Sequence, residues 1–193
     1  MVNMIKNNPQ LGPYLCGCLE DAGIKVEIDP DLTSEDYVAI KVDNYYAGLR
    51  LGGITPKAVD FLVVVDCHCD WYAMYILEFK NVKGPEKLNI SDIQEKFTTT
   101  INSFLNKTFA DIFLNDRFKY RAVKLYLVSD AYGEVGRFKS HDDYLAFRQK
   151  INKRDSLKVD VSLSSKLYKF RGKLLRIEYD IPPNPIISRI QSS

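Results

Sequence analysis

Two apolar segments separated by a short polar turn constrain this chain more than any other feature. Ala58 to Val65 and Tyr72 to Val82 are rich in Val, Ile, Phe and Tyr, the residue types that favour β-strands. The residues between them, Asp66 to Asp70, are polar and suit a turn. The pattern predicts an antiparallel β-hairpin.

Hydrophobic periodicity on either side of this hairpin predicts further strands and helices. Before the hairpin we expect a short helix over Pro9 to Ala22 closed by Gly23, followed by strands over Tyr37 to Val42 and Tyr45 to Leu51 that a turn at Asp43-Asn44 joins. After it we expect a long amphipathic helix from Ile90 to about Leu114, with Ser91 and Gln94 as a capping box at its start. A buried strand over Ala122 to Val128 and a helix over His141 to Ile151 follow. The resulting order is helix, strands, helix, strand, which is typical of an α/β fold.

Length and composition predict one compact domain. A chain of 193 residues that is 46% hydrophobic can bury one ordinary core but not two large ones. We assign residues 1–181 to this domain and Pro182 to Ser193, which contains three prolines, to a C-terminal tail. The apolar runs are too short to span a membrane, and Met1 to Asn8 lacks the apolar stretch of a signal peptide, so we expect a cytoplasmic protein with reduced thiols.

Charge is distributed unevenly along the chain. The stretch from Arg148 to Arg176 holds ten Lys and Arg against two Asp, so it carries +8, and the remainder carries −6 to give the net charge of +2. This asymmetry indicates a polyanionic partner, although a solvated basic surface explains it equally well.

Three charged residues of the predicted hairpin are expected to converge. Strand alternation places Glu78 and Lys80 on the same face, while Leu77 and Phe79 point the other way. If the turn is centred near Cys69, the numbers of paired residues sum to 137 or 138, which brings Asp60 next to or opposite Glu78. Charged groups at the end of an otherwise apolar strand are costly unless they are paired, solvated or bound to a ligand.

Asp60 followed after a hairpin by Glu78-x-Lys80, ahead of a long helix and a buried strand, resembles the PD-(D/E)xK nuclease superfamily. The resemblance covers about Pro9 to Ser129. It implies a restriction-endonuclease-like core with a mixed sheet flanked by helices, and a C-terminal basic strand region lies outside it. It further implies that Asp60, Glu78 and the backbone carbonyl of Phe79 bind Mg²⁺, for which Mn²⁺ can substitute, and that Lys80 positions or activates the attacking water. The first motif departs from the family pattern, since Pro56 lies four residues before Asp60.

The function implied by the resemblance is Mg²⁺-dependent hydrolysis of phosphodiester bonds in DNA, and we expect a restriction-type endonuclease that acts as a homodimer. A Holliday-junction resolvase or a repair nuclease shares the same core and is an alternative. A nucleic-acid-binding subunit whose core no longer cleaves is another. An E-x-K tripeptide taken alone is more often a surface salt bridge.

Several other residues are weaker candidates. Glu20 and Gln94 are possible accessory residues of the site, although a solvated helix face and a helix cap explain them as well. The pairs Cys16/Cys18 and Cys67/Cys69 have the wrong spacing for a structural zinc site, so free thiols are expected. Basic residues of the C-terminal region are the predicted DNA contacts, with Lys169, Arg171 and Lys173 on one face of a single strand that alternates with Tyr168 and Phe170; the full set is Lys166, Lys169, Arg171, Lys173 and Arg176.

Overall fold

A computed structural model describes residues 1–191 of the chain except 50–52, 54, 136, 138–139, 141, 144–145 and 147–155. The helical elements are α1 (Val2–Lys6), η1 (Gly12–Tyr14), α2 (Val42–Gly48), η2 (Pro85–Lys87), α3 (Ile90–Thr99), η3 (Thr100–Thr108), α4 (Ala110–Phe113) and α6 (Ser156–Ser164). The strands are β1 (Leu15–Cys16), β2 (Leu19–Asp21), β3 (Ile24–Val26), β4 (Tyr37–Lys41), β5 (Phe61–Asp66), β6 (Trp71–Phe79), β7 (Lys119–Val128), β8 (Tyr168–Phe170), β9 (Lys173–Leu175) and β10 (Ile177–Asp180).

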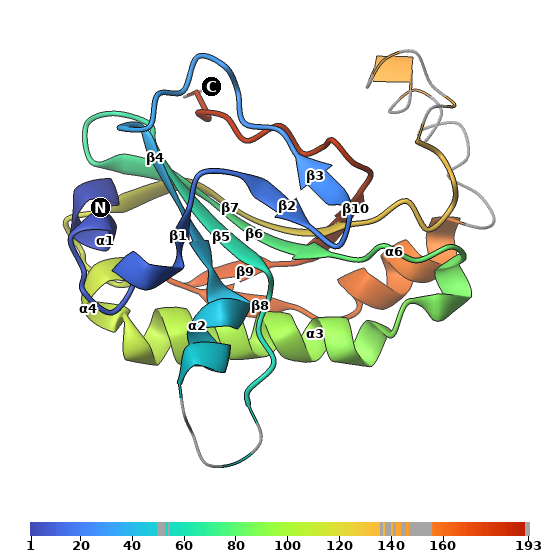
Figure 1. The fold of residues 1–193 in the computed structure, drawn as a ribbon, viewed down its shortest axis with the longest axis horizontal. Coiled ribbons are helices and arrows are strands. Elements are labelled where there is room, and N and C mark those ends of the chain that lie inside the picture. The colour runs from blue at the N-terminus through green and yellow to red at the C-terminus, as the bar shows by residue number, and fades with distance from the viewer. Residues whose placement is uncertain are drawn as a thin grey trace.

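A mixed six-stranded sheet forms the centre of the protein (Figure 1). Its order is β1-β4-β5-β6-β7-β10, with antiparallel pairing from β1 to β6 and parallel pairing of β7 with both β6 and β10. Two short hairpins, β2-β3 and β8-β9, stand apart from this sheet. The predicted α/β class, a mixed sheet flanked by helices, is confirmed.

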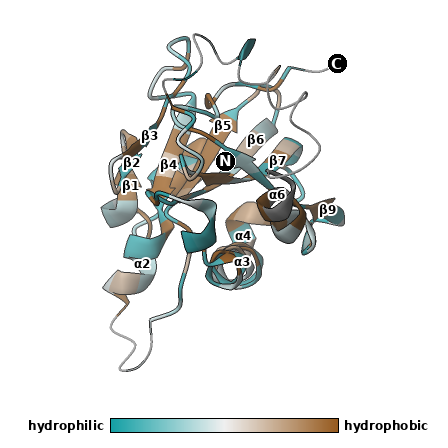
Figure 2. Cartoon of the chain, turned by 90° about the vertical axis from the view of Figure 1, so that its right-hand side faces the viewer, coloured by the Kyte–Doolittle hydropathy of each residue, from teal (hydrophilic) through white to brown (hydrophobic). Residues whose placement is uncertain are grey.

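The two faces of the sheet bury separate cores, because side chains alternate along each strand. Leu62, Val64 and Ile76 pack toward α3 and η3, in a core that includes Phe97 and Ile101. The alternate residues of the same strands, such as Val63 and Leu77, form a second core. Figure 2 shows the sheet between a layer of helices and a layer made mostly of loops and the small β2-β3 hairpin.

The predicted hairpin register is confirmed. β5 pairs with β6 from Phe61↔Leu77 to Asp66↔Tyr72, so paired residue numbers sum to 138. One more step along this register places Asp60 opposite Glu78. His68, Cys69 and Asp70 in the turn all have positive φ, a backbone conformation that is unusual for residues other than glycine.

The predicted long helix is also present, with two differences. Asn89 caps it, because its side chain accepts a hydrogen bond from the backbone of Asp92, so the Ser91–Gln94 capping box is wrong. From Thr100 the helix widens into nine residues of π-helix, η3, before α4. β7 contains the predicted strand Ala122 to Val128 and begins three residues earlier.

Two predictions for the N-terminal third are wrong. Residues 9–22 form η1, β1 and β2 rather than a helix, because Gly12, Pro13 and Gly17 interrupt it and Leu15-Cys16 pairs with the edge of β4. The predicted strand Tyr45 to Leu51 begins instead as helix α2, and its last residues lie outside the described ranges. Its adjacent side chains, Tyr45 and Tyr46, are both buried, which a helix with an apolar side allows and strand alternation does not.

The basic C-terminal region forms a hairpin instead of the single strand predicted. β8 ends at Phe170, Arg171 and Gly172 make the turn with positive φ, and β9 begins at Lys173. Lys169, Arg171 and Lys173 therefore do not share one face of a strand. The predicted helix over His141 to Ile151 falls mostly on residues outside the described ranges.

The segment from Pro182 to Gln191 belongs to the predicted C-terminal tail, and it packs along the second core. Ile187 is fully buried and forms a bridge with Ile28, and Arg189 pairs with Asp36. None of the helices in the described part of the chain is long and apolar enough to cross a membrane.

Candidate metal centre

Asp60 and Glu78 lie side by side at one end of the sheet, on the face that α3 covers. Asp60 immediately precedes β5, and its carbonyl accepts a hydrogen bond from the backbone of Val42. Its carboxylate Oδ2 accepts a second bond from the backbone N–H of Phe79, at 2.6 Å. This bond links the residue before β5 to the last residue of β6, where the sequence predicts that Asp60 and Glu78 converge.

Glu78 has a side chain with no exposure to solvent, and its two oxygens have different surroundings. Oε1 accepts a hydrogen bond from Lys96 Nζ at 2.7 Å and forms an ion pair with Lys80 Nζ at 2.8 Å. Oε2 is buried and has no hydrogen-bond partner among the residues that the structure describes. A buried carboxylate oxygen without a partner is costly, so this atom is a candidate metal ligand.

Lys80 lies beside Glu78 as the strand alternation predicts. Its backbone is anchored at both ends of the residue, since its N–H donates to the carbonyl of Val128 and its carbonyl accepts from the hydroxyl of Ser129. Ser129 is in turn held by Tyr179, whose hydroxyl donates to the Ser129 carbonyl at 2.6 Å. These bonds fix where the Lys80 side chain leaves the end of the sheet.

Lys96 on α3 is a functional candidate that the sequence analysis did not identify. Besides its bond to Glu78, Lys96 Nζ lies 3.8 Å from Asp60 Oδ1, so one ammonium bridges the two carboxylates. One turn later, Thr100 Oγ1 accepts from the backbone of Val59, next to Asp60. Lys96 and Thr100 flank the apolar stripe of the helix and are four residues apart, so they lie on the same side of it. This spacing is the sequence pattern from which the pair could have been predicted.

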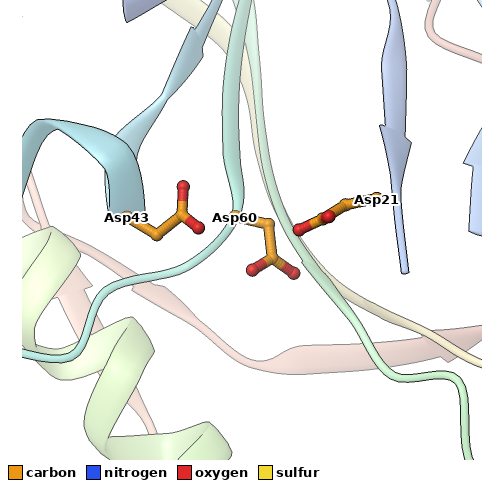
Figure 3. A group of neighbouring side chains, drawn as sticks. All are labelled: Asp21, Asp43 and Asp60. Atoms are coloured by element: carbon orange, nitrogen blue, oxygen red, sulfur yellow. The ribbon is translucent and has the colours of Figure 1, made fainter. Parts of the chain in front are cut away.

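A second set of carboxylates meets Asp60 from other elements (Figure 3). Asp21 ends β2 and Asp43 lies in the first turn of α2. Each contributes one oxygen to a group with Asp60 in which all three atoms lie within 4.8 Å of one another. We call Asp21, Asp43 and Asp60 the acidic triad. Figure 3 shows Asp21 and Asp43 on opposite sides of Asp60, with their carboxylates directed toward it.

Burial and like charge disturb the protonation of this group. Burial, together with the neighbouring charge of Glu78, raises the pKa of Asp60 from 3.8 to about 7. Burial also raises the pKa of Asp43. For Lys96, burial alone would lower the pKa, but the attraction of Glu78 and Asp60 outweighs it and the pKa is raised. Asp60 and Asp43 thus hold their protons more tightly than ordinary carboxyl groups do, because the nearby positive charge does not offset their burial and mutual repulsion. Lys96 stays protonated.

These residues fit a divalent cation. Carboxylate oxygens are the ligands that Mg²⁺ prefers, and Glu78 Oε2 offers a buried oxygen to which no described residue donates a hydrogen bond. The acidic triad and Glu78 carry four negative charges when ionised, and Lys80 and Lys96 carry two positive ones. The remaining charge of −2 equals that needed to neutralise one divalent cation.

Phe79 and the two proposed accessory residues have other contacts. The ring of Phe79 packs against Phe61 in the second core, so only its backbone is near the carboxylates. Glu20 is exposed on β2, opposite Lys25, and its neighbour Asp21 supplies the acid instead. Gln94 donates to the carbonyl of Ser162 and so joins α3 to α6.

The residues predicted to bind DNA are divided between structural contacts and exposed positions. Arg171 donates to the carbonyls of Asn115 and Phe118 and pairs with Asp116. Lys173 donates to the carbonyl of Tyr120, and Lys166 to the hydroxyl of Thr98. Lys169 and Arg176 are exposed.

All four cysteines are free thiols, as predicted.

Comparison with protein-family models, with curated proteins and with solved structures gives no match. A function for this protein is therefore inferred from its fold and this site.

Proposed function

We propose that the protein is a Mg²⁺-dependent DNA endonuclease with a restriction-endonuclease-like core. The observation that carries the proposal is the buried Asp60–Glu78 pair, in which Glu78 Oε2 has no partner in the described part of the chain although Glu78 Oε1 has two. A salt bridge at the surface would not bury Glu78 completely, and a purely structural ion pair would not leave one of its oxygens unsatisfied.

Asp60 Oδ1 and Glu78 Oε2 are the oxygens that would hold the metal, with the Phe79 carbonyl as a further ligand and Mn²⁺ as a substitute ion. Asp60 Oδ2 is already held by the Phe79 N–H, which orients the other oxygen. Asp21 and Asp43 add negative charge next to Asp60 and would bind water molecules of the hydrated ion. A bound divalent ion supplies an activated water and neutralises charge on the phosphate.

Lys80 has the position expected of the group that orients the attacking water or stabilises the phosphate charge. Its Nζ lies 2.8 Å from Glu78 Oε1, and 26% of its side chain is exposed to solvent. The ammonium therefore reaches both the Glu78 carboxylate and solvent. A fixed ammonium beside a developing anion stabilises the transition state without further rearrangement.

DNA as the substrate is supported by the resemblance of the Asp60, Glu78-x-Lys80 pattern and by the excess of basic residues from Arg148 to Arg176. A restriction-type activity, a homodimer and a cytoplasmic location belong to the same proposal. Each active site cuts one strand, so cleavage of both strands requires two copies.

Nicking of supercoiled plasmid by the purified protein tests the proposal. Wild type should nick in Mg²⁺ or Mn²⁺ and not in EDTA, while Glu78→Ala and Asp60→Ala should bind DNA and fail to cut. Glu20→Ala is the matched control, because it removes an acid next to the acidic triad without touching it, and it should cut like wild type. Equal nicking by Glu78→Ala would contradict the site, and DNA binding without any cleavage by wild type would favour the inactive binding subunit.

A further inference from the structure

We infer that Lys96 is a built-in counter-ion that competes with the metal for the Asp60–Glu78 pair. The Lys96 ammonium bridges the two carboxylates, and it would have to give up this position for a divalent cation to bind there. Lys96 is therefore a positioning residue that sets how strongly the site binds metal. The inference rests on the proposed function, because it takes Asp60 and Glu78 as the metal ligands.

The geometry singles out Lys96 among the lysines near the site. Its Nζ is 2.7 Å from Glu78 Oε1 and 3.8 Å from Asp60 Oδ1, so it lies between the two proposed ligands. Lys80 has an ion pair with Glu78 and none with Asp60 among the described residues. Lys57 pairs with Asp92 and Glu95 on the outside of α3, away from both.

The position of Lys96 offsets part of the cost of burying the two carboxylates. Only 16% of its side chain is exposed, so solvent screens its charge poorly. A divalent ion bound between Asp60 and Glu78 would lie within a few ångströms of this ammonium and would be repelled by it. The same ammonium that stabilises the two carboxylates therefore weakens metal binding.

Removal of the charge should consequently tighten metal binding. We expect Lys96→Gln, which keeps a hydrogen-bond donor for Glu78 but no charge, to lower the Kd for Mg²⁺ and Mn²⁺ by on the order of tenfold or more. Lys96→Arg keeps the charge and should stay near the wild-type Kd. Lys57→Gln is the matched control, since it removes a lysine charge from the same helix surface without a contact to Asp60 or Glu78, and its Kd should not change.

Isothermal titration calorimetry of each variant with Mg²⁺ and Mn²⁺, without DNA, measures these constants, and thermal unfolding in EDTA checks that each variant is folded. Wild-type binding with an equal or higher Kd in Lys96→Gln would overturn the counter-ion role and leave the proposed function intact. Binding by Lys96→Gln but not by wild type would support it strongly. Absence of binding in both would overturn the metal site itself, and the inference with it.

Discussion

Replacement of Asp60 by Asn should stabilise the metal-free protein while it abolishes cleavage. Asp60 is buried beside Glu78, and its pKa rises from 3.8 to about 7. Below pH 4 the group is protonated in both the folded and the unfolded chain. As pH rises from 4 to 7, the unfolded chain releases the proton and the folded chain keeps it, so the folded protein loses stability over this window.

The size of this effect follows from the raised pKa. The interval between 3.8 and about 7 corresponds to a cost of about 4 kcal/mol above pH 7, at about 1.36 kcal/mol per pH unit. The raised pKa already includes the attraction of Lys96 and the hydrogen bond from the Phe79 N–H, and Asn keeps an oxygen that accepts this bond. Asp60→Asn should therefore gain up to about 4 kcal/mol at pH 8, or a rise in Tm of roughly 8 to 16 °C.

Urea and thermal unfolding in EDTA at pH 5 and pH 8 measure the gain. It should be less than half as large at pH 5 as at pH 8, and saturating Mg²⁺ should reduce it by stabilising only the wild type. Glu20→Gln, an exposed acid nearby, is the control and should change neither value. A lower Tm for Asp60→Asn at pH 8 would refute the reasoning, because it would show that Asp60 is a net stabilising partner of Lys96.

Four further predictions concern single residues. Lys80→Ala should lower the cleavage rate by a factor on the order of 10² while calorimetry still detects Mg²⁺ binding; equal loss of metal affinity would make Lys80 a partner of the carboxylates only. Arg171→Ala should cost about 2 kcal/mol in urea unfolding without weakening DNA binding, because its guanidinium holds two backbone carbonyls, whereas exposed Lys169→Ala should leave stability unchanged. Thr100→Val leaves the buried N–H of Val59 without an acceptor and should cost about 1 to 3 kcal/mol, and an unchanged urea midpoint would contradict this role. Burial raises the pKa of Cys16 to about 11, so iodoacetamide at pH 8 should modify it on the order of a hundredfold more slowly than a free cysteine, as followed by peptide mass mapping.

The part of the site that lies within one hairpin was predictable from sequence. A hairpin with a short turn has few possible registers, so the turn at Asp66 to Asp70 sufficed to place Asp60 next to or opposite Glu78, and the structure has them opposite. Strand alternation then placed Lys80 beside Glu78. These are local constraints, and the structure agrees with each of them.

The remaining members of the site depend on contacts between distant segments. Asp21, Asp43 and Lys96 come from β2, α2 and α3, and no local pattern states which side of the sheet each element packs against. The same limit explains the error at Tyr45, whose residue type favours a strand but whose ring is buried against Phe104 and Phe109 when α2 is helical. Tertiary packing decided both cases.

The acidic triad also has a consequence for local opening of the fold. Asp21 belongs to the β2-β3 hairpin, which is outside the central sheet and is held against it by Leu19, Ile24 and Val26. The charge of Asp21 repels that of Asp43 and favours partial detachment of this hairpin, whereas a hydrated cation whose waters Asp21 and Asp43 bind would hold the hairpin to the sheet. Amide exchange and protease cleavage within residues 19–26 should then slow when metal is added, so that the hairpin reports on occupancy of a site to which it contributes a single side chain.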